Sequence, residues 1–254
     1  MTLLSGAHVL VTRPAHQAEN LSALITELGG IAVKFPTLAI VPLEESEAIK
    51  EVIAQQASYQ WLVFISANAV TMHGYYSDSD KIKKFKSTRI VAIGNATAQA
   101  LINAGWNVDL VADSGFTSEA LLAMPALQEV NTQRFLIIRG QGGREELASA
   151  LRKRGAEVDY LEVYKRVKPE QDCTYVHGLL EQDKLAVITI TSGEALQNLL
   201  TLLAGGDQSR LLTIPLVVVS DRIRHLAAEI GFTRITVAQS PSDSAILDTI
   251  IKCV

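Results

Sequence analysis

The segment His8-Val-Leu-Val-Thr-Arg13 is a short apolar run ending in an arginine, and Arg134-Phe-Leu-Ile-Ile-Arg139 repeats its pattern 126 residues later. The same offset aligns further identical residues without a gap, from about residue 10 to residue 121. These pairs include Glu19/Glu145, Leu21/Leu147, Gly29/Gly155, Ser66/Ser192, Ala69/Ala195, Val91/Val217 and Gly105/Gly231. A single register held over this length predicts a tandem duplication of a unit of about half the chain.

Both repeats show the same order of expected elements. After the first β-branched run comes an amphipathic stretch, with Leu21, Leu24, Ile25 and Leu28 at helical spacing. Glycine then ends the helix, and an extended run follows at 32–41 or 158–167. The further expected strands are 61–65, 89–93, 186–191 and 216–219. Apolar strands that alternate with helices favour parallel sheets covered on both faces, so we expect an α/β fold of flavodoxin-like type.

Composition narrows the class of protein. The 254 residues are 48% hydrophobic and 20% charged, as in an ordinary soluble protein with one large domain or two of typical size. A net charge of −4 without a basic run argues against a nucleic-acid partner. Neither a signal peptide nor an apolar stretch of the ~20 residues that span a membrane is apparent. Cys173 and Cys253 form no CxxC pair, which indicates a reducing compartment such as the cytoplasm.

The candidate site comprises residues that follow the expected strands, because ligands of open parallel sheets bind beyond the carboxyl ends of the strands. Most of these residues are Ser, Thr, Asn or Gly and come just before a helix. The segments are Thr12-Arg13-Pro14, Ser66-Ala67-Asn68, Gly94-Asn95-Ala96-Thr97, Arg139-Gly140-Gln141-Gly142-Gly143, Thr191-Ser192-Gly193-Glu194 and Ser220-Asp221. Helix starts offer free N–H groups and partial positive charge, so with Arg13 and Arg139 the set predicts an anion site. The alternative is that each residue is only a structural cap.

Other motifs of known chemistry are missing. The segment Arg139-Gly-Gln-Gly-Gly-Arg144 lacks the third glycine of a GxGxxG turn, because that position is Glu145. The five histidines show no metal-ligand spacing, and there is no GxSxG, HExxH or P-loop. An enzyme with this sequence is expected to work by binding and positioning, without a metal or nucleotide cofactor.

Several of these segments resemble the uroporphyrinogen-III synthase family, especially its bacterial members. They occur in order along the whole chain, at 9–14, 35–36, 64–70, 92–98, 136–144, 155–158, 163–166 and 190–193. The resemblance implies two α/β lobes joined by a two-stranded antiparallel ladder formed near 34–41 and 159–168. The first lobe then holds 1–35 with 169–254, the second holds 42–158, and 36–41 with 159–168 connect them.

The resemblance also implies an activity. The family cyclises hydroxymethylbilane, with loss of water and inversion of ring D, to uroporphyrinogen III in tetrapyrrole biosynthesis (haem, sirohaem, cobalamin). We therefore expect a cofactor-free hydro-lyase that acts as a cytoplasmic monomer on a small polycarboxylate, with no nucleic-acid or membrane partner. Without enzyme the bilane closes uninverted to the type I isomer, so the protein must favour one geometry of attack.

Tyr164 is the expected catalytic residue, because it aligns with a family tyrosine and its phenol could donate a proton to the departing hydroxyl. Its counterpart in the first repeat is Leu38, so the repeats differ here; the alternative for Tyr164 is a core aromatic. Thr97 matches a family threonine, whereas the segment 220–222 departs from the pattern at 94–98 and is given no catalytic role. The expected substrate-binding residues are Arg13, Ser66, Asn68, Gly94, Thr97, Arg139, Gly140, Ser192, Gly193 and Ser220.

Two other functions remain open from the sequence. One is a non-catalytic, tetrapyrrole-sensing or regulatory protein of the same fold, and the other is a two-lobed binder of a small anionic metabolite. An assay of bilane cyclisation that resolves the product isomers separates all three.

Overall fold

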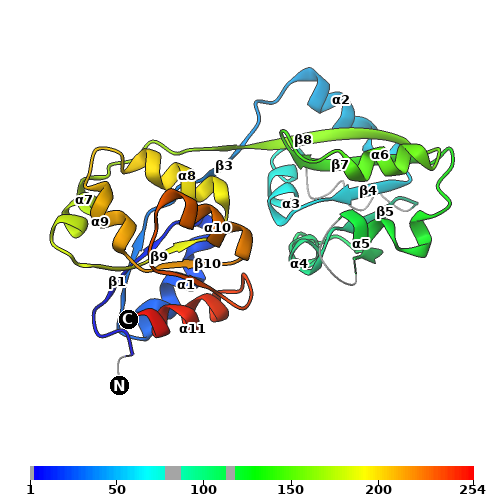
Figure 1. The fold of residues 1–254 in the computed structure, drawn as a ribbon. Helices are drawn as coiled ribbons and strands as arrows, with labels where there is room; N and C mark the ends of the chain where they lie inside the picture. The colour runs from blue at the N-terminus through cyan, green and yellow to red at the C-terminus, as the bar shows by residue number, and fades with distance from the viewer. Residues whose placement is uncertain (1–2, 78–86, 113–117) are drawn as a thin grey trace. The chain divides into compact units, whose positions relative to one another are not determined.

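The computed structural model describes residues 3–77, 87–112 and 118–254, and the chain divides into two compact units (Figure 1). Unit 1 contains Met1–Ala39 and Val167–Val254, and unit 2 contains Ile40–Arg166. Unit 1 is thus assembled from both ends of the chain. The segments expected to connect two lobes, 36–41 and 159–168, are divided between the units, and a separate connecting ladder stays a prediction.

Unit 1 is a doubly wound parallel sheet. Its strands are β1 (His8–Val11), β2 (Ile31–Lys34), β9 (Leu185–Ile190), β10 (Leu216–Val218) and β11 (Ile235–Val237). They lie in the order β11-β10-β9-β1-β2, and all neighbours are parallel. Counted along the chain within the unit, this order is 2-1-3-4-5, which is the flavodoxin-like order.

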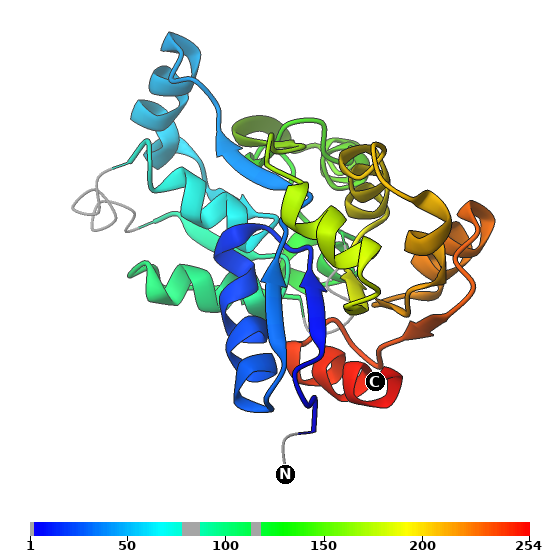
Figure 2. The ribbon, with the colours of Figure 1, turned by 90° about the vertical axis from the view of Figure 1, so that its left-hand side faces the viewer.

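Helices cover both faces of the unit 1 sheet. They are α1 (Ala15–Glu27), α7 (Thr174–Glu181), α8 (Gly193–Leu202), α9 (Gln208–Thr213), α10 (Asp221–Ile230) and α11 (Asp243–Cys253). One apolar core contains Leu21 of α1 and Ile246 of α11, and these two helices contact each other (Figure 2). Helices α7 to α10 contribute to a second core on the other face, with Leu196 among its buried members.

Unit 2 has a six-stranded sheet in the order β3-β8-β7-β4-β5-β6. Its strands are β3 (Ala39–Pro42), β4 (Trp61–Phe64), β5 (Arg89–Ala92), β6 (Leu110–Val111), β7 (Arg134–Gly140) and β8 (Glu157–Val167). Neighbours from β8 to β6 are parallel, and beyond β3 the Leu43 amide donates to the Val163 carbonyl at 3.3 Å.

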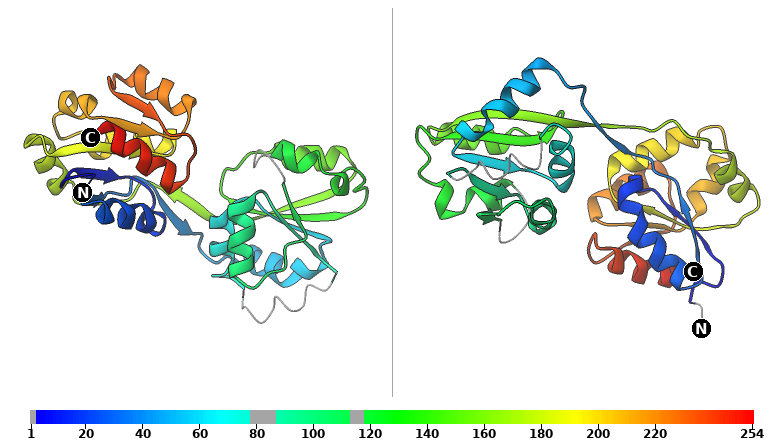
Figure 3. Two further views of the ribbon diagram at one scale, coloured as in Figure 1. Left: turned by 90° about the horizontal axis from the view of Figure 1, so that it is seen from below. Right: turned by 180° about the vertical axis from the view of Figure 1, so that it is seen from behind.

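The unit 2 helices also lie on both sides of their sheet (Figure 3). They are α2 (Glu47–Gln55), α3 (Ala67–His73), α4 (Asn95–Asn103), α5 (Ser118–Leu122) and α6 (Glu146–Lys153), with 3₁₀ turns at Gln56–Ser58 and Pro125–Leu127. One of the two cores of this unit contains Trp61 of β4 stacked on Phe135 of β7, with ring centroids 5.3 Å apart. In the described part of the chain, no helix has both the length and the apolar character needed to cross a bilayer.

Secondary-structure elements recur at the offset found in the sequence. The pairs of elements β1/β7, β2/β8, α3/α8 and α4/α10 each begin 126 positions apart. Unit 1 takes its first two strands from the first half of the chain and its other three from the second half. Unit 2 combines β3 to β6 of the first half with β7 and β8 of the second. Without β3, the order β8-β7-β4-β5-β6 corresponds to the order in unit 1 strand for strand.

The expected single run 32–41 is wrong in one respect, because the structure has two strands, β2 and β3, with Phe35–Leu38 between them. Pro36 has no N–H for a sheet ladder and restricts the residue before it. The intervening chain is held in unit 1 instead. The Thr37 amide donates to the Thr12 carbonyl at 3.1 Å, and the Thr37 carbonyl accepts from Asn198 Nδ2 at 2.9 Å.

Candidate functional site

Three of the expected site residues lie at or just beyond the carboxyl ends of neighbouring strands of unit 2. Gly140 ends β7, Ser66 follows β4 and Gly94 follows β5, and these strands lie side by side in this order. The pair β7/β4 is the point where the strand order reverses, since β8 lies on one side of β7 and β5 on the far side of β4. Ligands of doubly wound sheets bind at such a switch point, beyond the carboxyl ends of the strands.

The ring of Tyr164 lies directly against Gly140. The parallel pairing of β7 with β8 shifts after Arg139, so Gly140 pairs with Tyr164 rather than with Val163. A Cβ atom added to Gly140 would lie 2.5 Å from Cε2 and Cζ of the tyrosine and 2.9 Å from its hydroxyl oxygen. The amide of Gln141 donates to the Tyr164 carbonyl at 2.8 Å. Glycine at position 140 is therefore required for the ring to occupy this place.

The hydroxyl of Tyr164 reaches the start of α3. Its Oη lies 3.2 Å from Ser66 Oγ in a partly buried contact, whereas the residue as a whole is only 4% exposed. Ser66 also caps α3, because its Oγ accepts from the Ala69 amide at 3.0 Å. The structure thus brings together Tyr164, Ser66 and Gly140, with Asn68 in the first turn of α3.

Helix α4 begins beside this group without a side-chain cap. Gly94 is its N-cap in an extended conformation and has no side chain to accept from the first-turn amides. No acidic residue lies in that turn, and Thr97 is buried within it. Amides at a helix start without a capping side chain suit an anionic ligand.

The corresponding helix starts of unit 1 are less suited to anions. Ser192 and Ser220 cap α8 and α10, with Oγ to amide distances of 3.0 Å and 3.4 Å. Gly193, the first residue of α8, faces Leu226. Glu194 and Asp221 lie in the first turns, where their carboxylates already complement the positive end of each helix.

Both expected anion-binding arginines are engaged within their own unit. In unit 1, Arg13 forms an ion pair with Asp243 and donates to the Pro241 carbonyl at 2.7 Å, while Asn20 holds the other carboxylate oxygen. These contacts fix the end of β1 to the start of α11. Direct contact of the Arg13 guanidinium with a substrate stays a prediction, and it would compete with the bond to Asp243.

In unit 2, the side chain of Arg139 is only 6% exposed and bridges two carboxylates, Glu145 at 2.9 Å and Glu162 at 3.2 Å. Its guanidinium also lies over the Tyr160 ring, 4.1 Å from the centroid. Tyr160 donates to Glu145, and this hydrogen bond, followed by that of Arg139, lowers the pKa of the Glu145 carboxyl. Burial, followed by the bond to Glu145, raises the pKa of the Tyr160 phenol. Arg139 therefore anchors the 140–143 loop beside Tyr164.

The carboxylate partners were not found from the sequence. The sequence does hold a signal for Glu162. Strands β7 and β8 follow each other along the chain, and pairing them places Arg139 directly beside Glu162. For Asp243 there is none, since it lies 230 positions from Arg13. Among the described residues, no three or more His, Cys, Asp or Glu side chains form a group that could hold a metal ion.

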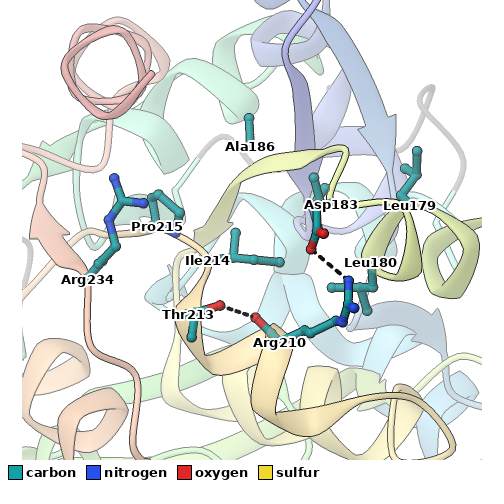
Figure 4. Close-up of a pocket in the computed structure, with 10 residues that line it drawn as sticks. Leu179, Leu180, Asp183, Ala186, Arg210, Thr213, Ile214, Pro215 and Arg234 are labelled. Atoms are coloured by element: carbon teal, nitrogen blue, oxygen red, sulfur yellow. Dashed lines mark hydrogen bonds and ion pairs between the residues drawn. The ribbon is translucent and has the colours of Figure 1, made fainter.

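A hollow of about 250 Å³ lies in unit 1 at the amino ends of β9, β10 and β11, whereas the expected site residues follow the carboxyl ends of the strands (Figure 4). Leu180, Ile214 and Pro215 form part of its apolar lining, and Arg210 pairs with Asp183 at 2.8 Å. None of the expected site residues lines this hollow. It shares no residue with the strand-end group of unit 2, which consists of Tyr164, Ser66 and Gly140.

The fold and the strand-end group define a doubly wound α/β protein with a tyrosine hydroxyl at the switch point of one unit. The family model described as "HEM4: Uroporphyrinogen-III synthase HemD" matches residues 19–248. The chain belongs to the uroporphyrinogen-III synthase family.

Named relatives cover almost the whole chain. A uroporphyrinogen-III synthase of Salmonella typhimurium is 34% identical over 94% of this chain and 98% of its own length. That of Escherichia coli is 32% identical with the same coverage. Solved uroporphyrinogen III synthases from Thermus thermophilus (16% identical, TM-score 0.62, 98% of both chains) and Helicobacter pylori (17%, 0.60, 97% and 99%) share the fold.

Proposed function

We propose that this chain is a uroporphyrinogen-III synthase that closes hydroxymethylbilane to uroporphyrinogen III with inversion of ring D. Family membership over residues 19–248 supports the reaction class. The observation that carries the mechanism is the Tyr164 hydroxyl, which lies 3.2 Å from Ser66 Oγ where β4 ends. The alternative of a non-catalytic binding protein is not favoured, since relatives matched over nearly their full length carry the enzyme's name.

The reaction needs a proton donor at the hydroxyl group that leaves the substrate. The C–O bond of the substrate's hydroxymethyl group breaks, the phenol of Tyr164 protonates the departing hydroxide, and water leaves. The azafulvenium cation that remains is attacked by the substituted carbon of ring D, and the resulting protonated spiro-pyrrolenine fragments and recloses with ring D inverted. The proton that ring D loses on final closure returns to the tyrosinate. The sum is loss of one water, as expected of a hydro-lyase.

Substrate carboxylates are bound, in this proposal, mainly by backbone amides rather than by free cations. The start of α4, with Gly94 and no acidic residue in its first turn, is the best candidate. Asn68 and Thr97 supply polar side chains near the same strand ends. Such a receptor holds the bilane in one geometry of attack, so that closure to the type III isomer is faster than spontaneous closure to type I.

The wider arrangement is proposed with the same function. Paired elements of the two repeats begin 126 residues apart. This supports a tandem duplication that gave two flavodoxin-like lobes joined by a β3–β8 ladder. On this proposal the protein acts as a monomer in the cytoplasm, without a cofactor.

The test is an isomer-resolved assay of Tyr164→Phe. Hydroxymethylbilane is incubated with each protein, the products are oxidised, and type I and type III porphyrins are separated. We expect the variant to fold, because the ring is retained, and to close the bilane roughly 10²- to 10⁴-fold more slowly, with the product shifted towards type I. A normal rate with pure type III product would leave Tyr164 as a packing residue.

A further inference from the structure

Ser66 makes two hydrogen bonds with one hydroxyl. Its Oγ accepts from the Ala69 amide at 3.0 Å and lies 3.2 Å from Tyr164 Oη. A serine hydroxyl has one donor and two acceptor lone pairs. The amide occupies one lone pair and leaves the Ser66 proton available for the phenol oxygen.

We propose that Ser66 is a positioning residue that donates to the phenol oxygen of Tyr164 and so directs the phenol's own proton towards the substrate. This inference rests on the proposed function. It assigns to Ser66 an action through Tyr164 instead of a direct contact with substrate. The chain of donors runs from the Ala69 amide to Ser66, from Ser66 to Tyr164, and from Tyr164 to the departing hydroxyl.

The direction of donation matters when the proton moves. As Tyr164 gives its proton to the leaving hydroxide, negative charge forms on Oη, and a Ser66 proton already aimed at that atom stabilises it. Hydrogen bonds to a charged oxygen are stronger than those to a neutral one, so this contact favours the transition state over the ground state. Ser66 itself neither gains nor loses a proton.

Capping alone does not account for this arrangement. Ser192, at the equivalent position of unit 1, caps α8 with the same 3.0 Å bond to the amide three residues on. The residue equivalent to Tyr164 is Leu38, which has no hydroxyl. The cap is therefore shared by both repeats, and the bond to a phenol belongs to Ser66.

The test is a double-mutant cycle of Ser66→Ala and Tyr164→Phe on the full-length protein with hydroxymethylbilane. We expect Ser66→Ala to lower kcat about tenfold with KM nearly unchanged, and to add nothing in the Tyr164→Phe background. Ser66→Thr, which keeps the hydroxyl and the cap, should restore most of the rate. Ser46→Ala removes the side-chain cap of α2, at a residue that has no hydrogen bond to Tyr164 and is not assigned to the site, and should leave kcat unchanged.

Several results would overturn the proposal. If the double variant loses rate by the product of the two single losses, or if only KM rises, Ser66 contacts the substrate directly and does not act through Tyr164. The same cycle measured by thermal unfolding without substrate should show coupling of roughly 2- to 12-fold in the unfolding constant. No coupling there would rule out the contact itself. A wild-type protein that forms no type III isomer would refute the proposed function and, with it, the catalytic use of Ser66.

Discussion

Replacing Gly140 with alanine should displace the Tyr164 ring. The added methyl carbon would lie 2.5 Å from Cε2 and Cζ, whereas ordinary contacts between such atoms begin near 3.4 Å. The ring must therefore retreat by about 1 Å, and a shift of this size breaks the 3.2 Å contact with Ser66. Overpacking of this kind typically costs about 1–3 kcal/mol, which should lower Tm by roughly 2–12 °C in a protein of this size.

The assay combines a thermal melt with the isomer-resolved product analysis. We expect Gly140→Ala to be folded at 25 °C, to melt earlier and to give more type I product, because the phenol no longer lies where it is needed. Gly205→Ala is the matched control, since a Cβ there meets no atom within 4 Å. A second variant, Gly140→Ala with Tyr164→Leu, should recover stability relative to the sum of the single changes, because the smaller side chain removes the clash.

A melting temperature and a product ratio equal to those of the wild type would refute this reasoning. It would mean that the ring does not lie against Gly140. Loss of stability with an unchanged product ratio would instead confirm the packing of the ring against Gly140 and contradict its role in the reaction.

Two further predictions concern buried and paired groups. Arg13→Ala should destabilise unit 1 by about 1–3 kcal/mol, because it leaves Asp243 and the Pro241 carbonyl without their main donor, and should raise KM only by a modest factor. A double-mutant cycle with Asp243→Ala checks this by calorimetry, and complete loss of activity in a folded Arg13→Ala protein would contradict it. Burial lowers the pKa of His73 from 6.5 to about 4, so stability should be complete above pH 6.5 and fall by up to about 3 kcal/mol as the pH drops towards 4. His73→Leu should flatten that acid limb in urea melts from pH 7 to pH 4, and an unchanged slope would show that His73 does not cause it.

The strand and helix pattern could be predicted because it depends on local signals. The apolar runs before Thr12 and Arg139, and serine at positions 66 and 192, mark strand–helix junctions that the structure places at or within a residue or two of the expected positions. The 126-residue register also carried the expected elements from one half to the other. The break at Pro36 was missed, although its ring and missing N–H were visible, because the apolar run continues on both sides.

The contacts within the site depend on the folded chain and were mostly hidden. The pairing of Arg13 with Asp243 joins residues 230 positions apart, and no periodicity links them. The position of the Tyr164 ring follows from a register shift after Arg139, which sequence spacing does not reveal. Even so, Tyr164, Ser66 and Gly140 were each selected from the sequence as site residues, and the structure brings these three together.

The strand order of unit 1 also determines when, during synthesis of the chain, its sheet can form. Strand β1 is made early, but its neighbour β9 begins at Leu185, more than 170 residues after Val11. At about 5–20 residues per second, a ribosome needs roughly 10–35 seconds to supply that partner. During this interval the segment that becomes β1 and β2 has no central strand to pair with, while residues 40–166 can already close their own sheet. The segment that forms β1 and β2 is therefore exposed to premature association until β9 has been made.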